Sequence, residues 1–570
     1  METENKWIKT ILVHLGLILS AAVLFAASFP NPVIKNGFFL FAWFAYVPLL
    51  IVIKNNKPFI CVCWGVIYGF FAYLLFNYWL GNFHPLAGFL VYSIYSVIFA
   101  VIFLLFKISD LLFPKRGYLV QWIIFLAFEY LRTLGFTGYP YGITGYSQWQ
   151  IIPLIQIASI TGVWGVSALV TFPSFWLANV INEKKNLTTE YTEHTEVNVR
   201  IFSPSSVFSV LSVVRNSDKI PVLCWLVVLI ASIIFGFINM KDYSSYPKAN
   251  IALIQHNTDP WEASKAPASA QVIEAYRKDL SILTRLSDKA LASEPIPQMV
   301  VWSETAFIPR IYWHTTYRDD RNSWLIVKDL LEYLSGKDTP FLIGNDDARM
   351  DPALNSNVQE RYRVDYNAAM LFEKENNTET YRKIHLVPFT EYFPYKKRFP
   401  KIYDWLEKAD THFWEKGSEE TVFNGPGFKF CAPICFEDSF GYLSRNFVKK
   451  GAEVIINLTN DAWSNSLSSQ KQHLSMAVFR AVENRRSMVR STSSGQTCAI
   501  DPNGRIFAEA LPFTETWLNA SIPLVKNTEF TVYTVLGDYM GVFLVIMASL
   551  LLISSGVWYT IKKLKNRGQQ

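Results

Sequence analysis

The residues FCAPICFED at positions 430–438 form an apolar run that ends in a thiol and two carboxylates. Two other segments in the same half of the chain have a similar form. MVVWSE at 299–304 is an apolar run that leads into a glutamate, and YRKIHLVPFTE at 381–391 carries a lysine and ends on a glutamate. Each segment therefore places a reactive side chain next to the end of a predicted strand.

Taken singly, none of the three segments identifies a catalytic site. A cysteine in a strand is more often an inert packing residue than a nucleophile. A carboxylate at a strand end is usually a solvated loop charge, and a lysine among Tyr, Arg and His usually lies on the surface. Only the combination of Glu304, Lys383 and Cys435 is informative.

These segments lie in a polar block in which short β-branched runs alternate with longer amphipathic ones. Apolar side chains at helical spacing predict helices at 271–292 and 470–486. The alternation of strands and helices describes one α/β domain. The expected strands are 251–255, 299–302, 341–343, 368–372, 428–435, 454–458, 488–491, 497–500 and 505–507, the last two flanking a predicted turn.

The rest of the chain is far more apolar. Charged residues make up 18% of the whole chain, against roughly 25% in an ordinary soluble domain. A bilayer-spanning helix needs about 20 mostly apolar residues. We expect about eight spans, and the sixth leaves room for a break near Gly162 or Pro173. The runs lie near 8–28, 37–54, 58–81, 88–107, 118–134, 151–182, 221–240 and 540–560.

Lysine and arginine set the expected orientation, because cytoplasmic loops carry an excess of both. They lie at the N-terminus, after the second, fourth and sixth spans, and in the C-terminal tail. The loops after the first, third and fifth spans hold only Lys35, with Arg132 near the end of the fifth. Both termini are therefore expected in the cytoplasm and the polar block outside, which in a bacterium is the periplasm.

This arrangement predicts three parts of the chain. Residues 1–240 form the membrane domain with spans one to seven, 241–535 form the outer α/β domain, and 536–570 hold span eight and a basic cytoplasmic tail. The first span could also be a cleaved signal peptide, but its apolar core is longer than the usual 7–15 residues or so, which favours a retained helix. The polar cytoplasmic insertion 183–220 favours a disordered linker, with a surface-lying helix as the alternative.

Several classes of function have no support in the sequence. Six cysteines at irregular spacing do not make a disulfide framework, and no CxxC pair, HExxH or His-rich tract predicts a metal site. No GxGxxG fingerprint or P-loop indicates a nucleotide. The net charge of +6 is spread over short groups beside apolar runs, so nucleic acid is not an expected partner.

The three segments, in this order, resemble the Glu–Lys–Cys motifs of the nitrilase, or carbon–nitrogen hydrolase, superfamily. In the membrane half, EYLR, TGYP and GYSQ resemble the fifth-span region of the apolipoprotein N-acyltransferases; they lie at 129–132, 137–140 and 145–148. The resemblance covers almost the whole chain. It implies a polytopic α-helical membrane domain joined to an α/β nitrilase-like αββα sandwich.

The resemblance also implies roles for three catalytic residues. Cys435 would be the nucleophile, Glu304 the base that takes its proton, and Lys383 the ammonium that stabilises the oxyanion. This fits the chemistry of a thiol, which is a weak nucleophile until a base or a nearby cation favours the thiolate.

Three further residues are expected to support this triad. Glu391 would hold the lysine or serve in proton transfer, and Glu437 resembles a family carboxylate close to the nucleophile. The backbone N–H near Phe436 would be a second oxyanion donor. Phe436 stands where the family often has Tyr, so a hydroxyl cannot be essential there. Trp261 has the wrong spacing for the tryptophan that the family carries after its first strand.

The implied reaction is a ping-pong acyl transfer. A membrane phospholipid would donate an acyl chain to Cys435, and the N-terminal cysteine of a diacylated apolipoprotein would accept it as an amide. No cofactor is needed, because a thioester conserves the activation of the acyl group. The chain is expected to act as a monomer.

Two alternative functions remain open. One is a membrane-tethered nitrilase or amidase acting on a small amide, and the other is a transporter or receptor with an inactive outer domain. The aromatic and basic segment 388–415 is expected either to dip into the headgroup region and gate access or to pack as an ordinary loop.

Overall fold

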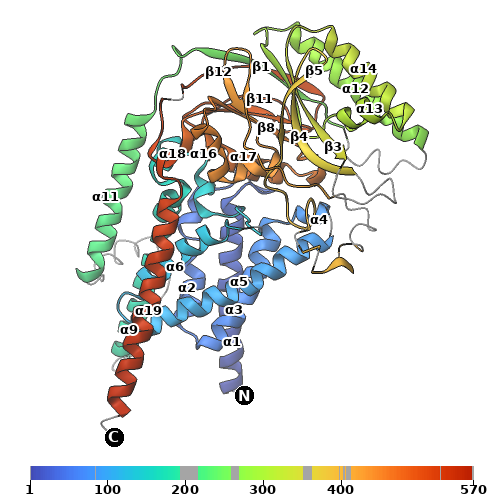
Figure 1. Ribbon diagram of the computed structural model, residues 1–570. Coiled ribbons are helices and arrows are strands. Elements are labelled where there is room, and N and C mark those ends of the chain that lie inside the picture. The colour runs from blue at the N-terminus through green and yellow to red at the C-terminus, as the bar shows by residue number, and fades with distance from the viewer. Residues whose placement is uncertain are drawn as a thin grey trace. The chain divides into compact units, whose positions relative to one another are not determined.

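The computed structural model contains two compact units. The first comprises Met1–Leu134, Gly142–Asn239 and Asp538–Gln570, and the second comprises Gly135–Tyr141 and Met240–Gly537. Figure 1 follows the chain through both. The residues that the structure describes are 2–83, 85–135, 137–192, 216–258, 269–350, 363–393, 395–396, 398–401, 403, 405, 413–526 and 528–567.

The first unit is helical (Figure 1). Its close packing is clearest between α3 and α5, where Gly65 and Gly69, one turn apart, lie against the α5 backbone. A Cβ at either position would come within 2.4 Å of a carbonyl oxygen of Phe99 or Tyr95, so only glycine allows this approach. The helices are α1 Glu2–Ser28, η1 Phe39–Trp43, α2 Val47–Lys54, α3 Pro58–Phe76, α4 Leu80–Phe83, α5 Pro85–Leu112, α6 Gly117–Leu131, η2 Thr144–Gln148, α7 Ile152–Ile155, α8 Ala158–Thr161, α9 Val163–Thr192, α11 Asn216–Asn239 and α19 Tyr539–Arg567.

All eight apolar runs that the sequence predicts as spans are helical, and in the described part of the chain six are long and apolar enough to cross a membrane. The other two, Phe39–Lys54 and Gly117–Leu131, are apolar but shorter. The break in the sixth run falls at Gly162, whose φ of +65° ends α8, whereas Pro173 lies inside α9.

The expectation of a linker over 183–220 is wrong at its two edges. Helix α9 continues to Thr192, and α11 begins at Asn216. The apolar pattern stops short of these two helix ends. A helix that has already formed can extend into polar sequence at little cost, because each further residue adds a backbone hydrogen bond. Residues 193–215 lie outside the described part of the chain.

The second unit contains two six-stranded sheets. The first has the order β12-β1-β2-β3-β4-β5 and the second β11-β10-β9-β8-β7-β6, each with three parallel strands at its centre. The first sheet contains β1 Lys248–Gln255, β2 Met299–Trp302, β3 Phe341–Met350, β4 Arg363–Glu373, β5 Asn376–Arg382 and β12 Thr516–Pro523. The second contains β6 Val422–Asn424, β7 Lys429–Cys431, β8 Val454–Thr459, β9 Ser487–Thr492, β10 Cys498–Ile500 and β11 Ile506–Glu509.

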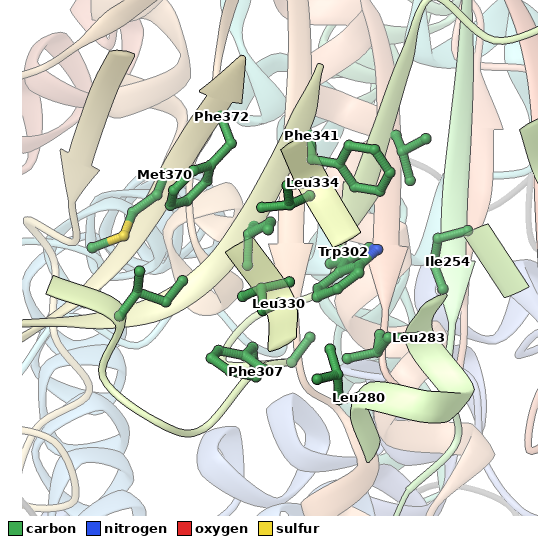
Figure 2. Packing of buried hydrophobic residues seen from close by; sticks show 14 of the residues in the cluster. Ile254, Leu280, Leu283, Trp302, Phe307, Leu330, Leu334, Phe341, Met370 and Phe372 are labelled. Atoms are coloured by element: carbon green, nitrogen blue, oxygen red, sulfur yellow. The ribbon is translucent and has the colours of Figure 1, made fainter. Parts of the chain in front are cut away.

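The two sheets pack face to face between layers of helices, as an αββα sandwich. Ser491 of β9 donates to the carbonyl of Val301 in β2 at 3.0 Å, across the two inner faces. The outer face of the first sheet is covered by helices whose leucines pack on Trp302 and Phe341 (Figure 2). The helices of this unit are α12 Ser269–Leu291, α13 Ile311–Tyr317, α14 Arg321–Ser335, η4 Cys435–Ser439, α16 Gly441–Lys449, η5 Ala462–Ser464, α17 Leu467–Asn484 and α18 Val532–Leu536.

One predicted strand is too long. The expected strand 428–435 ends at Cys431, and Cys435 instead begins the short helix η4. Pro433 has no N–H to donate to a ladder, and Cys435 has a φ of +52°, which a strand cannot contain. The sequence also missed β5, β6 and β12, which are all edge strands of the two sheets.

Candidate active site

The site lies where loops from both sheets meet beyond the ends of their central strands. Glu304 follows β2 by two residues, and Asn460 follows β8 directly. The backbone N–H of Asn460 donates to the Glu304 carboxylate at 2.9 Å, and Ser493, after β9, donates to the Asn460 side chain at 2.6 Å. Parallel strands bring their carboxyl ends to one edge, and this sets where the loops converge.

Glu304 is buried, with 6% of its surface exposed. Besides Asn460, its carboxylate accepts from the Asn367 amide at 2.8 Å and from the Lys383 ammonium at 3.2 Å. Gly344 of β3 makes room for this loop, because a Cβ there would lie 2.1 Å from the Ser303 carbonyl oxygen. These three donors fix the position of the Glu304 carboxylate, which accepts a hydrogen bond from each of them.

Lys383 follows β5 directly and is fully buried. Its ammonium forms ion pairs with Glu304 at 3.2 Å and with Glu391 at 2.8 Å. Burial alone would lower the pKa of Lys383, but the two carboxylates and the Cys435 sulfur outweigh it and hold that pKa well above its usual value. The ammonium therefore stays charged throughout the neutral pH range.

Glu391 is not a solvated loop charge. One of its carboxylate oxygens accepts from Lys383 and the other from the backbone N–H of Val387 at 2.9 Å. Burial raises the pKa of Glu391, while the neighbouring Lys383 lowers it. The turn that carries Glu391 closes on itself, since the Glu391 N–H donates to the Val387 carbonyl at 3.0 Å.

Cys435 sits on a sharp turn between a strand and a helix. It is the first residue of η4, its φ is +52°, and 9% of its surface is exposed. Burial and the charge of Glu304 raise the pKa of the thiol well above its usual value, although Lys383 lowers it. The resting cysteine is therefore a thiol, and a base must remove its proton before it can attack.

Glu437 fixes this turn from one side. Its carboxylate accepts from the backbone N–H groups of Ile434, Ile384 and His385 at 2.7 to 2.8 Å, and from the Tyr381 hydroxyl at 2.8 Å. Burial raises its pKa to about 7, against these hydrogen bonds, which lower it. Glu437 thus ties the Cys435 turn to the segment that carries Lys383.

Asp438 fixes the turn from the other side. It accepts from His473 of α17 at 2.6 Å and pairs with Arg490 of β9. The same two cations contact Asp461, at 3.1 Å from His473 and 3.3 Å from Arg490. Burial would lower the pKa of His473, but Asp438 and Asp461 raise it to about 9. The four side chains are fully buried and together carry no net charge.

Phe436, next to the nucleophile, packs against an aromatic residue from a distant part of the sequence. Its ring stacks on Tyr141, with centroids 6.2 Å apart and an interplanar angle of 11°. Tyr141 comes from the segment Gly135–Tyr141, which lies between two helical regions of the first unit in sequence but belongs to the second unit. Burial, with the charge of Asp461 next, raises the pKa of Tyr141 well above its usual value.

The structure brings all six predicted site residues into one region. Lys383 contacts Glu304 and Glu391 directly, and Cys435 lies within the electrostatic reach of all three. Glu437 and Phe436 flank Cys435 in the same short helix. Trp261 lies outside the described residues, as does part of 388–415.

Sequence reasoning gave no role to Asn367, to the buried Asp438 group or to Tyr141. A signal existed for the first two, because an Asn in the apolar strand β4 and an Arg in the apolar strand β9 both break a buried run. Such polar residues need a partner inside the fold. No local signal marks Tyr141. Among the described residues, no group of three or more His, Cys, Asp or Glu side chains is arranged to hold a metal ion.

Comparison with known proteins places both halves of the chain. Residues 250–530 match the carbon-nitrogen hydrolase family, and residues 21–176 match the apolipoprotein N-acyltransferase N-terminal domain. The chain is 43% identical to apolipoprotein N-acyltransferase 1 of Treponema denticola over 95% of this chain and 96% of that one. It is 43% identical to apolipoprotein N-acyltransferase 1 of Treponema pallidum over 98% of each, and 30% identical to the apolipoprotein N-acyltransferase of Geobacter metallireducens over 92% of each. The chain therefore belongs to the apolipoprotein N-acyltransferase family.

Proposed function

We propose that this protein moves an acyl chain from a membrane phospholipid to the N-terminal α-amino group of a diacylated apolipoprotein, through a thioester on Cys435. Lipoprotein N-acylation and acyltransferase activity follow from the family. One observation supports the mechanism above the others: the fully buried Lys383 ammonium, paired with Glu304 and Glu391, acts on the Cys435 thiol.

The first half-reaction forms the thioester. Glu304 takes the proton of the Cys435 thiol as the sulfur attacks the ester carbonyl carbon of the phospholipid. The Lys383 ammonium and the backbone N–H of Phe436 stabilise the oxyanion, since an N–H in the first turn of η4 has no intrahelical acceptor. As the intermediate collapses, the C–O bond breaks and the lysophospholipid leaves as an alcohol with the proton from Glu304.

The second half-reaction consumes the thioester. The free α-amino group of the apolipoprotein attacks the thioester carbonyl, and Glu304 accepts a proton from the nitrogen. The C–S bond then breaks and the sulfur takes that proton back, which yields the amide and restores the thiol. Losing one oxyanion donor typically costs about 3–4 kcal/mol, so a fixed ammonium at this position is worth about two to three orders of magnitude in rate.

The remaining site residues position these groups. Glu391 holds the Lys383 side chain, and its second hydrogen bond, to the Val387 N–H, keeps it from rotating away. Glu437 and Asp438 both hold the Cys435 turn, Glu437 through Ile434 and Asp438 through His473. A positive φ at a non-glycine residue is strained and persists only when its surroundings hold it, so these two carboxylates maintain the nucleophile in its turn.

We further propose that the protein lies in the bacterial inner membrane with both termini in the cytoplasm. The distribution of Lys and Arg between the loops supports this orientation. The catalytic part, 241–535, then faces the periplasm, where residues 1–240 and 536–570 anchor it. Both substrates are held in lipid, so anchoring keeps the thiol close to their headgroups.

The decisive experiment looks for the acyl-enzyme. Purified protein is incubated with a phospholipid labelled in its acyl chain and is then denatured, and we expect a labelled adduct that hydroxylamine removes. Cys435→Ala should abolish the adduct, while Cys431→Ala, at a buried cysteine four residues away, should keep it. A wild-type protein without adduct, or an adduct that persists in Cys435→Ala, contradicts the proposal. Addition of a diacylated lipopeptide should discharge the label onto the peptide, an outcome that an amidase would not give.

A further inference from the structure

The short helix α18, Val532–Leu536, has two different faces. Tyr533 and Thr534 are fully buried, whereas Val532, Val535 and Leu536 are 44%, 54% and 56% exposed. The exposed positions are spaced i, i+3 and i+4, which puts them on one side of a helix. The protein therefore presents a small apolar stripe, which Phe530, 45% exposed, extends before the helix begins.

The buried face fixes α18 firmly to the second unit. Arg445 of α16 donates to the carbonyls of Thr534 and Val535, both at 2.8 Å. Thr531, which caps α18, donates to the Glu483 carbonyl of α17 at 2.5 Å. With its polar and buried side bound so tightly, α18 cannot turn its apolar stripe inward.

The sequence next to the stripe indicates which kind of molecule contacts its apolar side chains. Tyr539, only three residues after Leu536, begins a helix that is long and apolar enough to cross a membrane. Three residues reach at most about 11 Å, and the headgroup zone on each side of a bilayer is about 5–7 Å thick. Asp538, between the two, carries a charge that belongs at the water side of this boundary. The stripe is therefore within reach of the lipid headgroups.

We propose that Phe530, Val532, Val535 and Leu536 form a lipid-contacting surface, through which α18 seats the catalytic unit in the bilayer interface. Amphipathic helices of this kind lie in the interface plane with their apolar side chains directed into the lipid. The proposal commits to phospholipid as the occupant, because the stripe continues directly into a membrane span.

The contact has a consequence for the catalytic turn. Tyr533 packs so closely on Gly441 that a Cβ there would lie 2.3 Å from its hydroxyl oxygen. Gly441 begins α16, and the Cys435 turn ends two residues earlier, at Ser439. The lipid-contacting surface is therefore joined, through the contact between Tyr533 and Gly441, to the start of α16, which directly follows the Cys435 turn. This step rests on the proposed function, which makes Cys435 the nucleophile.

The test measures lipid contact directly and needs no catalytic activity. In a background with the exposed Cys63 and Cys224 changed to Ser, Leu536→Cys is labelled with the fluorophore NBD, and the full-length protein is reconstituted into vesicles. Vesicles of phosphatidylcholine brominated high in the acyl chain quench a fluorophore that touches lipid. Leu511→Cys is the matched control, since Leu511 is 70% exposed but lies in the loop between β11 and β12.

We expect the label at 536 to lose fluorescence in brominated vesicles relative to unbrominated ones, with emission at a shorter wavelength than the label at 511. The label at 511 should lose none. Equal quenching at the two positions, or none at 536, overturns the proposal. Quenching that changes with the protein-to-lipid ratio also overturns it, because a second copy of the chain would then cover the stripe. Loss of the acyl adduct on Cys435 would leave this result untouched, so the two proposals fail separately.

Discussion

The buried group around Asp438 permits a quantitative prediction. His473, Arg490, Asp438 and Asp461 form two carboxylates and two cations without access to water. Asp438→Asn keeps the shape of the side chain but removes one charge, which leaves a buried excess of positive charge. Removing one partner of a buried ion pair typically costs about 3–5 kcal/mol.

The pKa of His473 gives an independent estimate of the same size. Asp438 and Asp461 raise that pKa from 6.5 to about 9. At 1.36 kcal/mol for each unit, the protonated imidazole contributes on the order of 3 kcal/mol to folding. Because the folded pKa lies above the unfolded one, this contribution is complete below pH 6.5 and is lost as the pH rises through 9.

The assay is thermal unfolding of the purified protein in detergent at pH 6 and at pH 10. A loss of about 3 kcal/mol should lower the unfolding midpoint by roughly 5 °C in a domain of this size. The difference in midpoint between wild type and Asp438→Asn should be wider at pH 6 than at pH 10. The control is Asp288→Asn, which breaks a 2.7 Å ion pair between Asp288 and Lys337 on the surface.

An exposed ion pair of this kind is worth at most about 1 kcal/mol, so Asp288→Asn should leave the midpoint almost unchanged at both pH values. The reasoning is refuted if Asp438→Asn unfolds at the wild-type temperature at pH 6. It is equally refuted if the difference in unfolding midpoint between wild type and Asp438→Asn does not narrow as the pH rises. The stability lost in Asp438→Asn would then not come from the interaction with protonated His473.

Two further predictions follow from the site and its packing. Lys383→Met should slow thioester formation by about two to three orders of magnitude, because the oxyanion loses its charged donor; the burst of labelled acyl-enzyme measures this, and a burst at the wild-type rate would contradict the assigned role. Gly441→Ala should destabilise the protein by about 1–3 kcal/mol, because the new methyl group meets the Tyr533 hydroxyl oxygen at 2.3 Å. Thermal unfolding of Gly441→Ala in a Tyr533→Phe background should recover most of that loss, and a double variant no more stable than Gly441→Ala would show that the hydroxyl is not the obstacle.

The central strands of both sheets were predictable from the sequence, but of the four edge strands only β11 was. The strands β1, β2 and β8 are almost entirely buried and contain runs of apolar residues. By contrast, β5 reads Asn-Asn-Thr-Glu-Thr-Tyr-Arg and is largely exposed. An edge strand is held in the sheet by backbone hydrogen bonds to its neighbour. Those bonds need no apolar side chains, so the sequence of such a strand can lack a hydrophobic pattern.

The site residues were recognised through the resemblance of three segments to the nitrilase superfamily. Glu304 and Cys435 stand where an apolar run gives way to polar sequence, whereas Lys383 follows β5, a polar antiparallel edge strand. The error at 428–435 is instructive, because the apolar run does continue to the nucleophile. The strand itself ends at Cys431, because Pro433 has no N–H for the ladder and Cys435 has a positive φ. Glu437 holds this turn by accepting hydrogen bonds from Ile434 and from residues about fifty positions away.

The sequence by itself determined the two-part organisation of this protein. Long apolar runs indicate segments surrounded by lipid, and more polar sequence indicates a domain in water, whatever the rest of the fold is. It also holds the Glu–Lys–Cys motifs through which the chain resembles the nitrilase superfamily. Only the tertiary structure decided how Cys435 is held, with Glu437 on one side, Asp438 on the other and Tyr141 stacked beside it. Those contacts join residues far apart in the chain, and no local pattern records a partner that the fold alone brings near.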